Sequence, residues 1–148
     1  MIPTLPLHFE DLAAGQEYQS AGRTLTETDI VNFAMLSGDW NPLHVDAVHA
    51  TGAAFGRPGV HGMCGLAVMG GLMYAAGWFS TTVEALLGFE EVRFTAPIFP
   101  GDTITCRMTI VSTRLSRRGR GVVVRQLELL NQRGELVQTC TSPVIIKR

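Results

Sequence analysis

One long stretch of this sequence, from Val60 to Gly77, contains no Asp, Glu, Lys or Arg. A helix over these residues would be apolar on every side, so its surface must be covered by protein or by lipid. The residues that follow alternate between polar and apolar side chains, which indicates strands that bury one face. We therefore expect a buried helix wrapped by its own sheet, although the stretch approaches the length of a membrane span.

Strand patterns occupy the second half of the sequence. The clearest is Ile104 to Ile110, where four apolar side chains alternate with Thr and Arg. Further strands are expected over Glu91 to Phe94, Val122 to Leu130 and Leu136 to Ile146, and the run Asn131 to Gly134 predicts a hairpin between the last two. The long helix should thus be followed by four antiparallel strands.

Smaller elements are expected ahead of the long helix. One strand is predicted within Gly15 to Leu25. The run Thr26 to Asp29 offers cap-forming side chains and early negative charge, and the apolar side chains after it, at spacings of three and four, predict a helix that Gly38 ends. A turn is expected at Asp39 to Pro42, followed by a short helix over Ala47 to Phe55.

These elements predict an α+β fold in which an antiparallel β-sheet is wrapped around a long central α-helix. The helix needs cover, and an antiparallel sheet offers one apolar face. The length of 148 residues suits a single domain over residues 1–148, which can bury an ordinary core without metals or disulfides.

The amino-acid composition limits which binding partners and which cellular compartment we expect for this protein. A formal net charge of -1 with 17% charged residues gives no basic field, so nucleic acid is not an expected partner. The three cysteines, Cys64, Cys106 and Cys140, are odd in number and widely spaced, which suits buried thiols in a reducing compartment. Residues 1–10 lack the pattern of a secretory signal, and we expect a cytoplasmic protein without a membrane partner.

Five arginines form the basic cluster of the sequence. Such a cluster is usually a solvated connection between strands, but it could also attract the phosphates of coenzyme A or an acidic acyl carrier. Both interpretations stay open for Arg114, Arg117, Arg118, Arg120 and Arg125.

A carboxylate and an imidazole stand close together in the run Gly38 to His44. Asp39 and His44 are five positions apart around Pro42, and the apolar sequence nearby suggests a dry pocket beside them. Such a pair can move water onto or off a substrate by taking and giving protons. The residues alone leave a second interpretation open, in which Asp39 caps a turn and His44 is a loop histidine.

The spacing of residues around this pair resembles a known family. Phe33-Ala34-x-Leu36-Ser37-Gly38-Asp39-x-Asn41-Pro42-Leu43-His44-x-Asp46, followed by Gly56-x-Pro58-x-x-His61-Gly62-Met63, is similar to the MaoC-like dehydratases. These include the R-specific enoyl-thioester hydratases of the hotdog fold. The resemblance implies that Asp39 and His44 are the catalytic pair, and that the chain forms a homodimer or a dimer-based oligomer.

Gly62 is expected at the start of the long helix, where the first amides have no intrahelical partner and lie at the positive end of the helix dipole. Its N–H could stabilise an oxyanion, and the resemblance assigns it to the thioester carbonyl of the substrate. Gly62 could instead only permit close packing. Trp40 could line the acyl pocket or simply pack, and Asn41 could position substrate or bond the backbone. All three are candidate substrate-binding residues.

Other residues of the long helix have open roles. His61 is expected to be structural. The glycines at 65, 70 and 71 could permit close approach of the sheet or of a bound substrate. The large side chains on and after the helix could shape an acyl tunnel or belong to the core: Met69, Met73, Trp78 and Phe79.

The resemblance implies reversible hydration of a trans-2-enoyl thioester, carried by coenzyme A or an acyl carrier, to the (R)-3-hydroxyacyl thioester. Asp39 would activate water at C3, and His44 would deliver a proton to C2. Thioesterases and acyl-carrier dehydratases of this fold generally place Asp or Glu on the central helix, and His61 to Gly77 has neither. A hotdog acyl-CoA thioesterase and a non-catalytic acyl-thioester-binding subunit of a heteromeric dehydratase remain as alternatives. No cofactor and no metal are expected.

Overall fold

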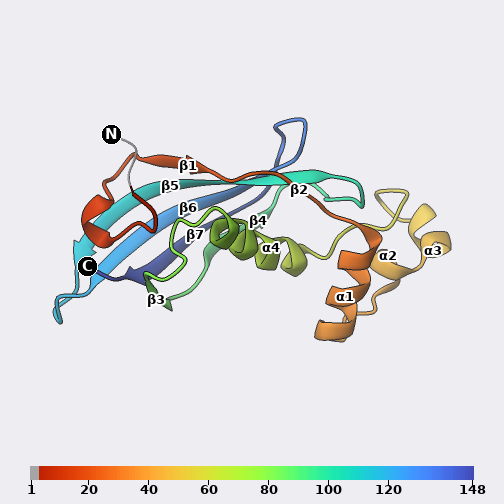
Figure 1. Cartoon of the computed structure of the whole chain (residues 1–148). Helices are drawn as coiled ribbons and strands as arrows, with labels where there is room; N and C mark the ends of the chain where they lie inside the picture. Colours follow the sequence, from red (N-terminus) through yellow and green to blue (C-terminus); the bar gives the residue numbers. More distant parts are fainter. Residues whose placement is uncertain (1–3) are drawn as a thin grey trace.

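The computed structural model describes residues 4–148 (Figure 1). Its α-helices are α1 (Glu27–Ser37), α2 (Pro42–Val45), α3 (Ala47–Thr51) and α4 (Gly62–Ala75), and a short 3-10 helix, η1, spans Phe9–Asp11. Its strands are β1 (Glu17–Gln19), β2 (Arg23–Thr24), β3 (Val83–Leu86), β4 (Glu90–Phe94), β5 (Thr103–Leu115), β6 (Gly121–Leu130) and β7 (Leu136–Ile146).

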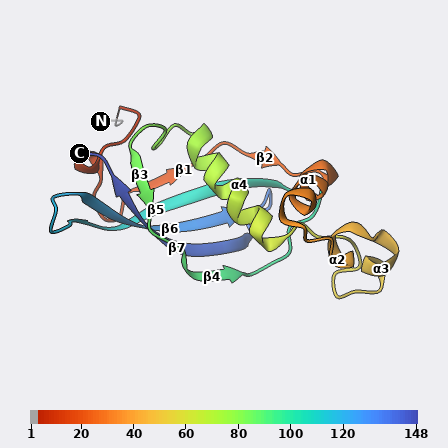
Figure 2. The same cartoon turned by 90° about the horizontal axis from the view of Figure 1, so that it is seen from below.

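The strands form one antiparallel sheet in the order β1-β5-β6-β7-β3, with β2 also pairing β5 and β4 also pairing β7. Helix α4 lies across one face of this sheet, and α1, α2 and α3 gather beyond one end of it (Figures 1 and 2). This arrangement of a central helix against an antiparallel sheet confirms the predicted α+β fold class.

Three long strands build the floor of the core. On β5 the side chains of Ile104, Cys106, Met108 and Ile110 are fully buried, while the residues between them are partly exposed. The register pairs Met108 with Leu127 of β6, and Leu127 with Cys140 of β7, so apolar side chains from three strands lie side by side. The strands predicted from alternation are confirmed, and β5 extends beyond its predicted end to Leu115.

The helix α4 is covered on one side only, whereas the sequence predicted cover on all sides. Its buried residues face the sheet: Cys64, Gly65, Leu66, Val68, Met69 and Leu72. On its other face Met63 is 62% exposed and Tyr74 is 70% exposed. A single sheet reaches only one side of a helix, so an apolar strip of α4 remains in contact with solvent in the single chain.

Several smaller elements differ from the predictions. The single strand expected within residues 15–25 is two short strands, β1 and β2, and the strand β3 was not predicted because its sequence lacks alternation. The turn expected at Asn41 and Pro42 begins a short helix, α2, since Asn41 caps it and proline suits the first helical position. Helix α3 ends at Thr51, before the predicted Phe55, with Gly52 as its C-cap.

The cysteines are free and buried as expected. Burial raises the pKa of the Cys106 thiol to about 12, so this thiol stays protonated at neutral pH. In residues 4–148, none of the helices has both the length and the hydropathy needed to cross a membrane.

The five arginines of the basic cluster do not form one continuous surface. Arg114, Arg117, Arg118 and Arg120 are exposed around the β5–β6 turn, but Arg125 is 3% exposed. The strand period explains the difference, because Arg125 lies on the face of β6 that also carries the buried Val123 and Leu127.

Candidate active site

Helix α1 ends where the candidate site begins. Gly38 adopts a left-handed conformation with φ of 76°, and its N–H donates to the Ala34 carbonyl at 2.8 Å. Glycine tolerates this conformation at no steric cost, so the chain can turn out of the helix at once. Asp39 follows, and its carboxylate Oδ1 accepts a 3.2 Å hydrogen bond from the N–H of Asn41.

His44 is positioned by the short helix α2. The Asn41 side chain accepts a hydrogen bond from the Leu43 N–H at 3.0 Å and so caps this helix. The Nδ1 atom of the half-buried His44 ring lies 2.8 Å from the Gly59 carbonyl, to which it donates. Because a carbonyl can only accept, Nδ1 carries the proton, and Nε2 is left for proton exchange.

His61, the N-cap residue of α4, contacts both His44 and the backbone of Asp39. Its ring is 2% exposed and stacks on the His44 ring, with 3.8 Å between centroids and 28° between planes. Its Nε2 donates to the backbone carbonyl of Asp39 at 2.9 Å. One carboxylate oxygen of Asp39 and one ring nitrogen from each of His44 and His61 all lie within 4.8 Å of one another. The structure therefore brings the predicted acid and base together and adds a second histidine.

The same three side chains could act together as ligands of a metal ion, and they are the group of this kind found within residues 4–148. Two imidazoles and one carboxylate suit several divalent transition metals. However, the Nδ1 of His44 and the Nε2 of His61 are engaged with backbone carbonyls, which leaves one nitrogen per ring. The expectation of no metal stays a prediction.

Gly62 begins α4, and no side chain within residues 4–148 caps this helix end. A Cβ atom at Gly62 would lie 2.7 Å from the ring of Phe94 on β4, so only glycine fits without a shift of that ring. The Gln138 amide donates to the Gly62 carbonyl at 3.0 Å and fixes the first turn of the helix on β7. Gly62 therefore permits close packing, and its placement also leaves the helix N-terminus open to a ligand.

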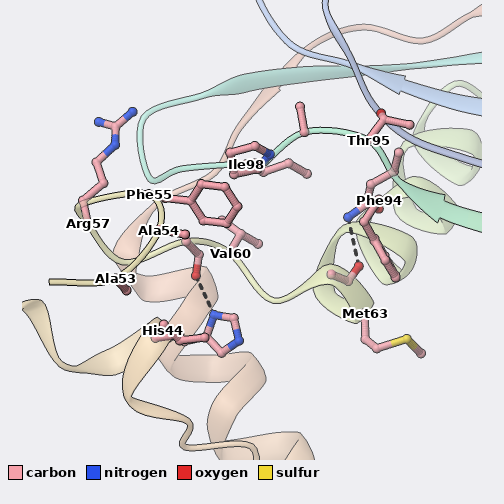
Figure 3. A pocket seen from close by; sticks show the side chains of 16 residues that line it. His44, Ala53, Ala54, Phe55, Arg57, Val60, Met63, Phe94, Thr95 and Ile98 are labelled. Carbon is pink, nitrogen blue, oxygen red and sulfur yellow. Dashed lines mark hydrogen bonds between the residues drawn. The ribbon is translucent and has the colours of Figure 1, made fainter. Parts of the chain in front are cut away.

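His44 and Gly62 line the same cavity of about 510 Å³, shown in Figure 3. Its walls are mostly apolar, with Phe55, Val60, Phe94 and Ile98 arranged around it (Figure 3). The volume falls within the range of small-molecule sites. The remaining lining residues come from α2, the loop after α3, the first turn of α4, the loop after β4 and the strand β7: Leu43, Ala53, Ala54, Arg57, Gly59, Met63, Thr95, Ala96, Pro97 and Gln138.

The other predicted site residues lie outside this cavity. Trp40 is 51% exposed and lines a second cavity of about 510 Å³, which His44 and Arg57 border as well. Asp39 and Asn41 line neither of these two cavities, which the described residues form. The side chains of Asp39 and Asn41 are both exposed. The dry pocket expected around the pair thus adjoins His44 only, because none of the residues 4–148 buries the side chain of Asp39.

Comparison with known proteins places the chain in a family. A model described as the MaoC like domain matches residues 9–132. The chain therefore belongs to the MaoC-like dehydratase family. Its fold also matches the crystal structure of a MaoC-like dehydratase from Rhodospirillum rubrum, with a TM-score of 0.82 and 30% identity over 96% of this chain and 97% of that chain. The hotdog arrangement expected from the motif is thereby confirmed.

Two curated relatives are similar in sequence. Protein MaoC of Klebsiella aerogenes is 43% identical over 102 residues, which cover 69% of this chain and 30% of that protein. An (R)-specific enoyl-CoA hydratase of Rhodospirillum rubrum is 35% identical over 107 residues, covering 70% of this chain and 69% of that protein. The chain thus spans less than a third of the Klebsiella protein, so an activity of that whole protein does not transfer directly.

Two residues of the site could not be identified from the sequence. Gln138 and Phe94 come from β7 and β4, and both contact Gly62. The sequence carries one weak signal for the first, since a glutamine at an inward position of an alternating strand must find a partner. Phe94 carried no such signal, because an aromatic residue at the end of a strand is ordinary.

Proposed function

We propose that this chain catalyses the reversible hydration of a trans-2-enoyl thioester to the (R)-3-hydroxyacyl thioester, with enoyl-CoA as the principal candidate substrate. The observation that supports it is the grouping of Asp39, His44 and His61 within 4.8 Å, beside the uncapped start of α4. Membership of a family with (R)-specific enoyl-CoA hydratases among its members supports the same reaction.

In this proposal the first turn of α4 binds the thioester. The carbonyl oxygen accepts a hydrogen bond from the Gly62 N–H, where the helix dipole also favours negative charge. The acyl chain lies against the apolar walls of the cavity that His44 and Gly62 share. This contact draws electrons from the C2=C3 double bond toward the carbonyl, and C3 becomes the position that water attacks.

The protons are then moved by the pair. Asp39 begins as a carboxylate and takes a proton from the water whose oxygen bonds to C3. The electron pair of the double bond moves to C2 through an enolate, and protonated His44 gives C2 its Nε2 proton. A water molecule then carries the proton from Asp39 to His44, because atoms up to 4.8 Å apart are too distant for a direct transfer, and the starting state is restored.

The alternatives have weaker support. Hotdog thioesterases generally place a carboxylate on the central helix, and α4 has the sequence GMCGLAVMGGLMYA without one. A non-catalytic thioester-binding subunit would have no need of an acid–base pair, yet Asp39 and His44 are both present. The exposed side chains of Asp39 and Trp40 fit a site that is completed by bound substrate or by a second copy of the chain.

The test is a steady-state assay of the purified chain with enoyl-CoA substrates of several lengths. Loss of absorbance by the enoyl double bond, with an (R)-3-hydroxyacyl product by chiral analysis, is the expected result. Release of free thiol without that loss would favour the thioesterase. Substrate binding without turnover, until another protein is added, would favour the partner-subunit alternative.

A further inference from the structure

Arg125 occupies a core position of the sheet. It lies on β6 between the fully buried Val123 and Leu127 on the same face, and it is itself 3% exposed. Charged side chains are rarely buried to this extent unless an opposite charge accompanies them. Within residues 4–148, however, no carboxylate lies within 4.0 Å of its guanidinium.

The partners of Arg125 are all neutral. Its Nε donates to the Ser142 carbonyl at 3.3 Å, one terminal nitrogen donates to the Ser142 hydroxyl at 2.9 Å, and the other reaches the Met73 sulfur at 3.7 Å. The guanidinium also lies 5.8 Å from the ring centroid of Phe79. Burial lowers the pKa of Arg125 to about 10, so the side chain is still a cation at neutral pH. Among the described residues, this buried positive charge thus has no carboxylate as an ion-pair partner.

A cavity lies beside this charge. It has a volume of about 310 Å³, is open to solvent, and is lined by the second half of α4, the segment that follows it, the strand β3 and the strands β6 and β7. Its walls are mainly apolar, with Met73, Phe79, Val83, Leu86 and Val144 among them. Among the described residues that line the cavity, Arg125 is charged and none is acidic.

We propose that this cavity binds a carboxylate carried on an apolar chain, with Arg125 as its counter-charge. A guanidinium presents paired N–H donors that match the two oxygens of a carboxylate. The apolar walls suit a hydrocarbon chain better than a small hydrated anion. The volume equals that of roughly ten water molecules in the liquid, which is enough for a chain of several carbons.

Two sources of such a carboxylate are compatible with the fold. Gly70, which lines this cavity, follows Gly62 by eight residues on α4, a distance of about 12 Å along the helix. A substrate whose thioester lies at Gly62 could therefore place a carboxylate at the far end of a long acyl chain beside Arg125. A free monocarboxylate bound separately is the other source. Only the first source rests on the proposed hydration.

Titration calorimetry with octanoate and 1-octanol tests the shared chemistry without any catalytic assay. We expect the protein to bind octanoate about tenfold to a hundredfold more tightly than 1-octanol, because only octanoate pairs with the cation. Arg125→Met should remove this preference, Arg125→Lys should keep part of it, and the exposed Arg114→Met should leave it unchanged. Equal affinities in the unaltered protein, no binding of octanoate, or a preference that survives Arg125→Met would overturn the proposal.

A second variant tests the same site in case the buried substitution Arg125→Met prevents the protein from folding. Leu86 is 53% exposed at the cavity wall, so Leu86→Trp should fold and obstruct the cavity. It should weaken octanoate binding at least tenfold. Unchanged octanoate binding in a folded Leu86→Trp protein would contradict a site in this cavity.

Kinetics then separate the two sources. If octanoate competes with trans-2-octenoyl-CoA, and an enoyl-CoA with a terminal carboxylate is the better substrate, the carboxylate belongs to the acyl chain. If octanoate binds without changing the KM for the enoyl-CoA, it is a separate ligand. Absence of hydration with every substrate would defeat the proposed function, whereas the calorimetry would still decide the carboxylate site.

Discussion

His44 is held from two sides, and both contacts bear on its chemistry. The Gly59 carbonyl accepts from Nδ1 at 2.8 Å, and the ring of His61 stacks on its face at 3.8 Å. The first contact fixes which nitrogen is free to exchange a proton, and the second limits rotation of the ring. His61 in turn holds the backbone of Asp39. His61, which the sequence predicted to be structural, thus contacts both members of the proposed pair and holds them in place.

Substitution of either member of the pair tests the mechanism at this scale. Asp39→Asn and His44→Gln should each lower kcat by about 10²- to 10⁴-fold, because each removes one proton-transfer group and leaves similar shape. Circular dichroism and thermal unfolding should match those of the unaltered protein. His49→Gln is the matched control, since this histidine is exposed on α3 and should turn over normally. Near-normal rates in either variant of the pair would refute the assignment.

At the scale of the element, α4 combines several tasks along one helix. Its first turn offers free amides to the site, its inner face packs on the sheet, and its outer face stays exposed. Close approach to β7 depends on Gly65, where a Cβ atom would overlap the amide of Gln138. By contrast, a Cβ atom at Gly71 would meet nothing within 4 Å. The helical glycines that look alike in the sequence are therefore not equivalent.

This difference predicts opposite effects of two alanine substitutions. Gly65→Ala should destabilise the protein by about 1–3 kcal/mol, because the added methyl group overpacks the contact with Gln138. Gly71→Ala should leave stability unchanged or raise it by up to about 1 kcal/mol, since alanine favours the helix. Urea unfolding of both variants measures the two effects. Equal stability of the two variants would show that the helix does not approach β7 this closely.

At the scale of the whole molecule, apolar surface remains uncovered. Met63 and Tyr74 on α4, and Leu87, Phe89 and Phe94 around β4, are between 43% and 70% exposed. The strand β4 pairs with β7 on one side only, so its other edge can accept a further strand. Asp39 and Trp40 are exposed as well. A second copy of the chain, joined along this edge, would cover surface of this kind.

We accordingly predict a homodimer in solution. Sedimentation velocity at micromolar concentration should give the mass of two chains, and Phe89→Glu should shift the equilibrium toward the monomer because it places a charge on the apolar surface. Activity should fall in parallel if the partner completes the site. Glu10→Gln, on the exposed 3-10 helix η1, serves as the control. A stable monomer with full activity would contradict this prediction.

The sequence by itself was enough for the local features. Alternation located β5, β6 and β7, the glycine at 38 ended α1, and the short spacing of Asp39 and His44 brought a potential acid and base near each other. These features depend on neighbours within a few positions, and backbone geometry links such neighbours to a known period or turn. Where the period was short or absent, as in β2 and β3, the prediction failed.

Only the tertiary structure decided the contacts between distant segments. The stacking of His61 on His44, the bond from Gln138 to Gly62 and the cavity beside Arg125 join residues from different elements. Strand register and the docking of α4 determine which of these side chains meet. Neither can be read from the apolar pattern, because that pattern specifies which face is buried and not which partner it meets.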